Sequence, residues 1–77
     1  MNQIPLEKLS ENQAAEIISV MGGRMAAKRL ADLGLITGAR IKILNKAILG
    51  GPIEIEAKGS KMFLGRGLAA KILVKPI

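Results

Sequence analysis

The 77-residue sequence contains no cysteine, histidine, tyrosine or tryptophan, and Phe63 is its single aromatic residue. Because nucleophile–base pairs of the Ser-His and Cys-His kinds need these missing side chains, both kinds are excluded. Glu54 and Glu56 share one face of an alternating segment. A solvated face paired with basic side chains explains them better than a catalytic pair of carboxylates. We therefore expect no catalytic residues and no enzymatic activity.

The same absences argue against a metal ion or a cofactor. Transition-metal sites favour imidazole, thiolate and carboxylate ligands, and this sequence offers only carboxylates, scattered among basic residues. Met25 and Met62 are interpreted as core or interface filler rather than as thioether ligands. Gly22-Gly23 is not followed by the GK[ST] that completes a phosphate-binding loop. We predict no metal site and no cofactor site within one chain, and leave open a metal shared between several chains.

Positive charge exceeds negative charge, with twelve lysine and arginine residues against six acidic ones and a net charge of +6. Nucleic acid, an anionic membrane surface, an acidic protein and simple solubility all fit this balance. Specific binding of single-stranded nucleic acid usually needs exposed aromatic rings, so none is expected here. No apolar run reaches the ~18 residues of a membrane span, and residues 1–10 lack the pattern of a secretory signal. With the lack of cysteine, this favours a cytoplasmic protein whose membrane contact is only peripheral, through a partner.

Apolar residues in the first half predict a strand followed by a helix. Residues 15–20 form a β-branched run that reads as a strand, and Gly22-Gly23 ends it. Residues 24–33 are good helix formers, with an apolar stripe at Ala26, Leu30 and Leu33. Gly34 is expected to end the helix in a left-handed conformation.

The second half alternates between apolar and polar residues. Residues 39–46 and 53–58 predict two antiparallel strands, with Arg40 and Lys42 facing the two glutamates of the other strand. A glycine-rich hairpin loop, residues 47–52, joins them. Residues 61–64 and 71–75 predict two further strands around a single helical turn at 65–70. About five strands in so small a chain favour a mainly β fold that closes into a small barrel with one helix after the first strand.

Several stretches, in order, resemble the FeoA family. They are Leu30-x-x-Leu33-Gly34-Leu35-Ile36-x-Gly38, then Leu49-Gly50-Gly51-Pro52-Ile53, then Leu64 with Arg66 and Ala69-Ala70. Thr37 departs from the proline that the family usually has there. The resemblance implies one domain over residues 1–77 with an SH3-like barrel fold. It also implies a role in ferrous iron uptake beside FeoB, the Fe²⁺ permease with a cytoplasmic GTPase domain.

Two surfaces are candidates for binding a protein partner. The first is the loop of Ile48, Leu49, Gly50 and Gly51, which forms an apolar tip if its side chains are exposed; folding back over the barrel is an equal alternative. The second is the basic helix face of Arg24, Lys28 and Arg29, for which a solvated face is the simpler interpretation. Self-association stays open. The alternative function is a nucleic-acid-associated or transcription-regulatory module, because the family domain also forms the C-terminal domain of DtxR-type iron-dependent repressors.

Overall fold

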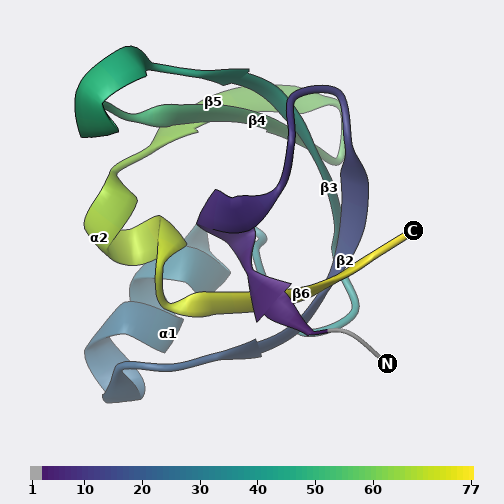
Figure 1. Ribbon diagram of the computed structural model, residues 1–77. Coiled ribbons are helices and arrows are strands. Elements are labelled where there is room, and N and C mark those ends of the chain that lie inside the picture. Colours follow the sequence, from purple (N-terminus) through teal and green to yellow (C-terminus); the bar gives the residue numbers. More distant parts are fainter. Residues whose placement is uncertain (1–2) are drawn as a thin grey trace.

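The computed structural model describes residues 3–77, except for the side chain of Ile48. Figure 1 shows the elements in chain order. They are β1 (Ile4–Pro5), η1 (Leu6–Lys8), β2 (Ala14–Val20), α1 (Gly23–Asp32), β3 (Arg40–Lys46), η2 (Ile48–Gly50), β4 (Ile53–Ala57), β5 (Ser60–Leu64), α2 (Arg66–Ala69) and β6 (Ile72–Pro76).

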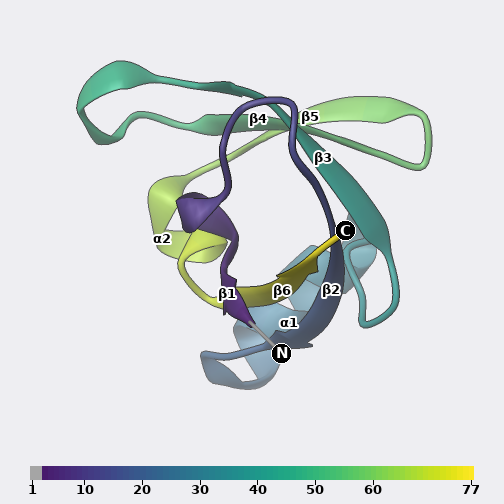
Figure 2. The same ribbon diagram turned by 45° about the vertical axis from the view of Figure 1, so that its right-hand side comes forward.

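The described strands form one antiparallel sheet in the order β1-β6-β2-β3-β4-β5. Figures 1 and 2 show the sheet curling around the centre of the molecule. The mainly β fold with one main helix after its first long strand is confirmed. One strand more than expected is present, because Ile4 and Pro5 pair with Val74 and Leu73 of β6. Within residues 3–77 no ladder joins β1 to β5, so the sheet curls without closing; η1 and α2 contact each other beside this seam.

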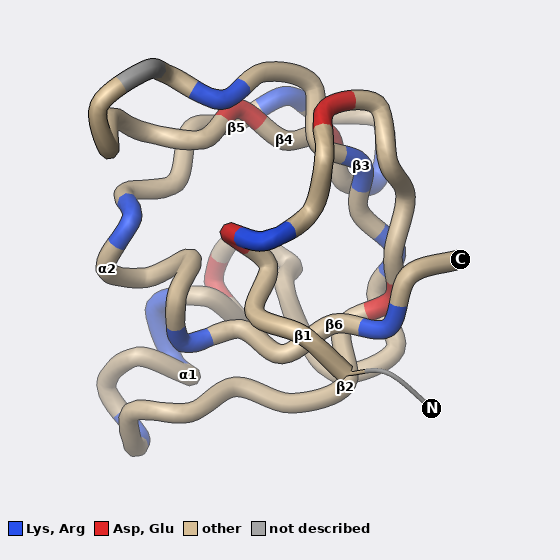
Figure 3. The backbone as a smooth tube through the Cα atoms, viewed as in Figure 1, with Lys and Arg blue, Asp and Glu red and all other residues tan. Residues whose placement is uncertain are grey.

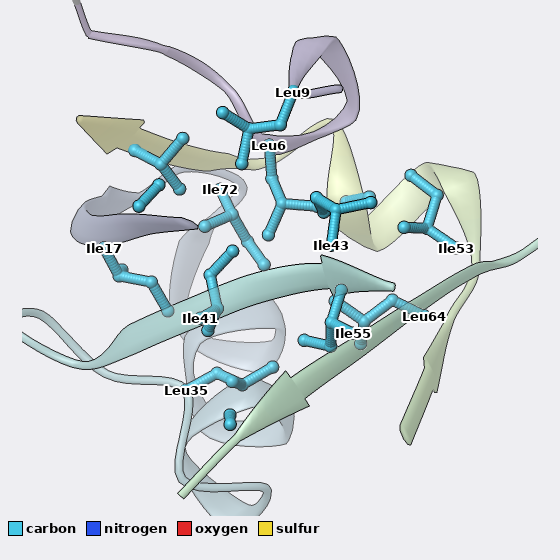
Figure 4. Packing of buried hydrophobic residues seen from close by; sticks show 14 of the residues in the cluster. Leu6, Leu9, Ile17, Leu35, Ile41, Ile43, Ile53, Ile55, Leu64 and Ile72 are labelled. Carbon is cyan, nitrogen blue, oxygen red and sulfur yellow. The ribbon is translucent and has the colours of Figure 1, made fainter. Parts of the chain in front are cut away.

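The core consists of aliphatic side chains from both halves of the chain. In β4, Ile53, Ile55 and Ala57 are buried while Glu54 and Glu56 are partly exposed, as alternation in a strand requires. Figure 4 shows side chains from the strands, α1 and the N-terminal segment meeting in the interior. The buried cluster contains Leu6, Leu9, Ala15, Ile17, Leu30, Leu35, Ile41, Ile43, Ile53, Ile55, Ala57, Leu64, Ala69, Ile72 and Val74. No polar side chain is buried among the described residues.

Helix α1 covers part of this core and ends as predicted. Ala26 and Leu30 are buried, and Gly34 has a φ of 83°. The Leu35 N–H donates to the Leu30 carbonyl oxygen at 2.9 Å, which places buried Leu35 against the helix end. The predicted apolar stripe is wrong at Leu33, which is 46% exposed. Leu33 is the helix C-cap and has a ψ of 1°. The chain turns at Gly34, and Leu35 is the residue that packs into the core in place of Leu33.

The ionic ladder predicted between β3 and β4 is only half right. Lys42 lies opposite Glu56 in the β3–β4 register, whereas Arg40 lies opposite Glu16 of β2. Glu54 lies opposite Asn45 and Phe63 instead of a basic residue. An antiparallel ladder that places Lys42 opposite Glu56 cannot also place Arg40 opposite Glu54, because the two strands run in opposite directions. The register shift between Ile43 and Asn45 then brings Glu54 opposite Asn45.

Candidate docking surfaces

The loop between β3 and β4 presents an exposed leucine. Leu49 is 98% exposed and adopts a left-handed backbone with φ of 64° and ψ of 35°. Such a conformation costs a residue with a β-carbon roughly 1–2 kcal/mol, and an exposed side chain gains no burial in return. In Figure 1 the loop lies at the upper left, at one end of the molecule. The side chain of Ile48 lies outside the described residues, so the predicted apolar tip rests on Leu49.

The base of this loop is held by hydrogen bonds to the main chain. Arg66, the first residue of α2, donates from Nε to the Gly51 carbonyl oxygen at 2.9 Å. Its second terminal nitrogen donates to the Ala47 carbonyl oxygen at 3.2 Å. The Ala47 N–H donates to the Pro52 carbonyl oxygen at 3.3 Å, so the two ends of the loop are tied together. The loop therefore projects Leu49 from a fixed base.

Lys46 fixes the end of β3 that leads into the loop. Its Nζ donates to the carbonyl oxygens of Glu7 and Leu9 at 2.8 and 2.9 Å. Its backbone N–H donates to Glu11 Oε2 at 3.1 Å. The N-terminal segment and the loop base thus form one hydrogen-bonded unit. Neither the Arg66 nor the Lys46 contact follows from spacing along the chain, so the sequence did not indicate a role for these two residues.

The basic helix residues Arg24, Lys28 and Arg29 are all exposed, but they do not form one face. Arg24 and Lys28 are four residues apart and lie on the same side of α1, whereas Arg29 is turned by about 100° from Lys28. Lys28 Nζ lies 3.9 Å from Asp32 Oδ2, in an exposed pair of small energetic weight. Figure 3 shows the basic positions of α1 at the end of the molecule away from the loop.

A shallow apolar groove runs beside α1, next to the side that carries Arg24 and Lys28. Its volume is about 420 Å³, and it is lined by Ser19, Val20, Ala27, Ala31, Leu35, Ile36 and Thr37. Ala27 and Ala31 are four residues apart, so two small side chains form the helix wall of the groove. That spacing is visible in the sequence and could have indicated the groove.

The two predicted surfaces are not contiguous. In Figures 1 and 2, α2 lies between the η2 loop and α1. The loop and the helix therefore offer separate contact regions on one side of the molecule. Met25 is 75% exposed, so the interpretation as core filler is wrong and the interface interpretation stays a prediction. Met62 packs against the core.

Other kinds of site find no support in the part of the chain that the structure covers. Between residues 3 and 77, no three side chains of histidine, cysteine, aspartate or glutamate come together in a way that would hold a metal ion. Over the same residues, no helix has the length and apolar character needed to cross a membrane.

Solved structures with low sequence identity share this fold. A Stenotrophomonas maltophilia FeoA, described as complexed with zinc and as a procaryotic SH3 domain protein, has a TM-score of 0.76 at 23% identity, covering 91% of this chain and 87% of that one. The architecture is accordingly SH3-like. A manganese-dependent transcriptional repressor has a TM-score of 0.91 at 16% identity, covering all of this chain and 38% of the repressor.

Closer relatives share sequence as well as fold. A protein of Methanocaldococcus jannaschii named for Fe(2+) transport is 34% identical over 71 residues, which covers 92% of this chain and 84% of the relative. A crystal structure described as an iron uptake regulatory protein (FeoA) has a TM-score of 0.91 at 28% identity, with both chains covered completely. The FeoA domain model matches residues 4–76. The chain therefore belongs to the FeoA family.

Proposed function

We propose that this protein is a cytoplasmic accessory of ferrous iron uptake that binds the cytoplasmic part of a FeoB-type permease. Membership of the FeoA family and a relative named for Fe(2+) transport support the iron transport role. The shortage of catalytic and metal-ligating side chains favours action through surface contacts.

The docking proposal rests on the exposed side chain and the left-handed backbone of Leu49. A large apolar side chain that is 98% exposed, on a backbone that disfavours it, lowers the stability of the isolated protein. Arg66 nevertheless holds the loop so that this side chain projects. Strained, exposed apolar residues on a fixed base are typical of contact sites. Leu49 would insert into an apolar pocket of the permease.

Docking would act on the permease by shifting its conformational or nucleotide state. A bound protein moves such an equilibrium only by the difference between its affinities for the two states. The basic residues Arg24 and Lys28 would add a second contact with an acidic patch or with anionic headgroups beside the permease. Because α2 separates the loop from α1, the permease surface would have to span both regions.

Binding to the purified cytoplasmic domain of the permease tests the loop. Leu49→Asp places a charge in the contact and should weaken binding by at least about tenfold, which corresponds to 1.4 kcal/mol. Ile77→Asp is the matched control, since Ile77 is also exposed at 64% and lies far from the loop in Figures 1 and 2. Measurements without nucleotide, with GDP and with a GTP analogue show which state is favoured. Equal affinity of wild type and a folded Leu49→Asp variant excludes the loop from the contact.

A separate pair of variants tests the basic helix residues. Arg24→Glu with Lys28→Glu should lower the affinity and its salt dependence. Lys8→Glu with Lys75→Glu changes the net charge equally at exposed positions away from α1. If both double variants lose the same affinity, overall charge and not the α1 residues attracts the permease.

A regulatory module is the second candidate, favoured by the fold shared with the manganese-dependent repressor. This chain corresponds to 38% of that repressor, so the comparison extends only to one of its parts. Sub-micromolar DNA binding that weakens steeply with salt supports this candidate. Absence of DNA binding at low salt excludes direct action on DNA.

A further inference from the structure

Strand β5 is an edge of the sheet, and its outward backbone groups are available for pairing. The turn before it consists of Lys58 and Gly59, with φ values of 54° and 78°. Such two-residue turns close on a hydrogen-bonded pair, here Ala57 and Ser60. Since hydrogen-bonded and non-hydrogen-bonded pairs alternate along an antiparallel ladder, the N–H and C=O groups of Lys61 and Phe63 point away from β4.

No other strand of the described chain pairs with this edge. Within residues 3–77, no backbone hydrogen bond outside the β4–β5 ladder involves Lys61 or Phe63. Figure 2 shows the β4–β5 turn extending away from the rest of the curled sheet. An uncovered edge strand is a template for pairing with another strand.

The side chains on the outer face of β5 favour a particular kind of strand. Phe63, the single aromatic residue of the chain, is 68% exposed there, and Lys61 is exposed on the same face two residues earlier. An ammonium group beside an aromatic ring is attracted to it. A lysine and a phenylalanine two residues apart on an edge are self-complementary when the second strand runs antiparallel.

We propose that β5 pairs antiparallel with β5 of a second copy of this chain, about a two-fold axis at Met62. In this register Lys61 lies opposite Phe63 of the second copy, and Phe63 opposite its Lys61. All four residues point their backbone groups across the interface, which gives four hydrogen bonds. On the outer face, Glu56 already lies opposite Lys61, and Glu54 opposite Phe63. Each new lysine–phenylalanine pair is therefore flanked by a carboxylate on both sides.

The neighbouring two-fold registers are poorer for reasons that the structure shows. An axis at Lys61 places the two Lys61 ammonium groups directly opposite each other, and like charges in that position are destabilising. An axis at Phe63 pairs Lys61 with Gly65 of the second copy. The Gly65 carbonyl oxygen already accepts from the Ala69 N–H at 3.0 Å, so two symmetry-related hydrogen bonds of this register, one to the Gly65 of each copy, are compromised. The register at Met62 avoids both costs.

The proposed dimer is weak and strengthened by salt. One five-residue strand buries less than the roughly 1,000 Å² of a stable interface. Each copy carries a net charge of +6, so added salt screens the repulsion between copies. An interface built on ion pairs would respond in the opposite direction. The pairing uses none of the residues proposed for the permease contact, so it does not depend on that contact.

Sedimentation over a range of protein concentrations, together with amide exchange, tests the proposal. We expect reversible dimers at high concentration, more dimer at higher salt, and slower exchange of the Lys61 and Phe63 amides as dimers form. Phe63→Lys places lysine opposite Lys61 and should weaken dimerisation by at least about tenfold. Lys61→Glu with Phe63→Lys places glutamate opposite lysine and should restore dimerisation. This rescue is specific to the register at Met62.

Three results would overturn the proposal. The first is a wild-type protein that stays monomeric at millimolar concentration, in which case the edge serves another protein or none. The second is a dimer whose Lys61 and Phe63 amides exchange as fast as in the monomer. The third is a Lys61→Glu, Phe63→Lys double variant that dimerises no better than a folded Phe63→Lys variant.

Discussion

Replacing Leu49 with asparagine should stabilise the fold while removing the proposed contact of Leu49 with the permease. The side chain is 98% exposed, so almost no burial is lost. Its backbone has a φ of 64°, a region that asparagine occupies more readily than leucine because its short polar side chain bonds locally. The left-handed backbone costs leucine roughly 1–2 kcal/mol. If asparagine removes half of this cost, the free energy of unfolding rises by about 0.5–1 kcal/mol. For a domain of this size that corresponds to a rise in Tm of about 2–8 °C.

Thermal and urea unfolding followed by circular dichroism measure this change, and the permease binding assay measures the functional cost. Lys58→Asn is the matched control, because Lys58 is also exposed with a positive φ of 54° but lies in the β4–β5 turn. We expect Lys58→Asn to raise Tm similarly with permease binding unchanged. If Leu49→Asn lowers Tm while the control raises it, Leu49 contributes packing and the account of a strained, exposed tip is wrong.

Three further substitutions test the contacts that shape the fold. Leu30→Ala removes a fully buried side chain and should lower the free energy of unfolding by about 2–5 kcal/mol in urea titrations. Arg66→Met leaves the Ala47 and Gly51 carbonyl oxygens without their donor. The free energy of unfolding should fall by about 1–3 kcal/mol, and the loop amides should exchange faster. Unchanged exchange would contradict the anchoring role of Arg66. Gly22→Ala brings a β-carbon within 2.6 Å of Lys71 Cδ at a φ of 97° and should cost about 1–2 kcal/mol, measurable by calorimetry.

The sequence predicted the elements whose pattern is local. Alternation in residues 53–58 indicated β4 and its buried face. The helix was indicated by good helix formers with Ala26 and Leu30 on its apolar side, and its end by Gly34. Asn12 has a left-handed backbone with a φ of 69°, a conformation that asparagine adopts more readily than most residues. These features depend on side-chain period and backbone sterics, which neighbouring residues determine.

Features that depend on distant contacts could not be predicted in this way. Strand β1 has only two residues and exists because β6 offers it a partner. The exposure of Leu33 follows from the conformation of the turn after α1. The hydrogen bonds of Arg66 to the loop join residues fifteen and nineteen positions apart. The separation of the loop from α1 is likewise a property of the tertiary arrangement.

The contacts made by Arg66 also bear on how freely the loop can change. Both acceptors are main-chain carbonyls, which every amino acid carries in the same place. These two hydrogen bonds therefore do not depend on which side chains the loop residues carry. Related chains can therefore carry other residues at the tip of the loop and keep the same hydrogen bonds at its base.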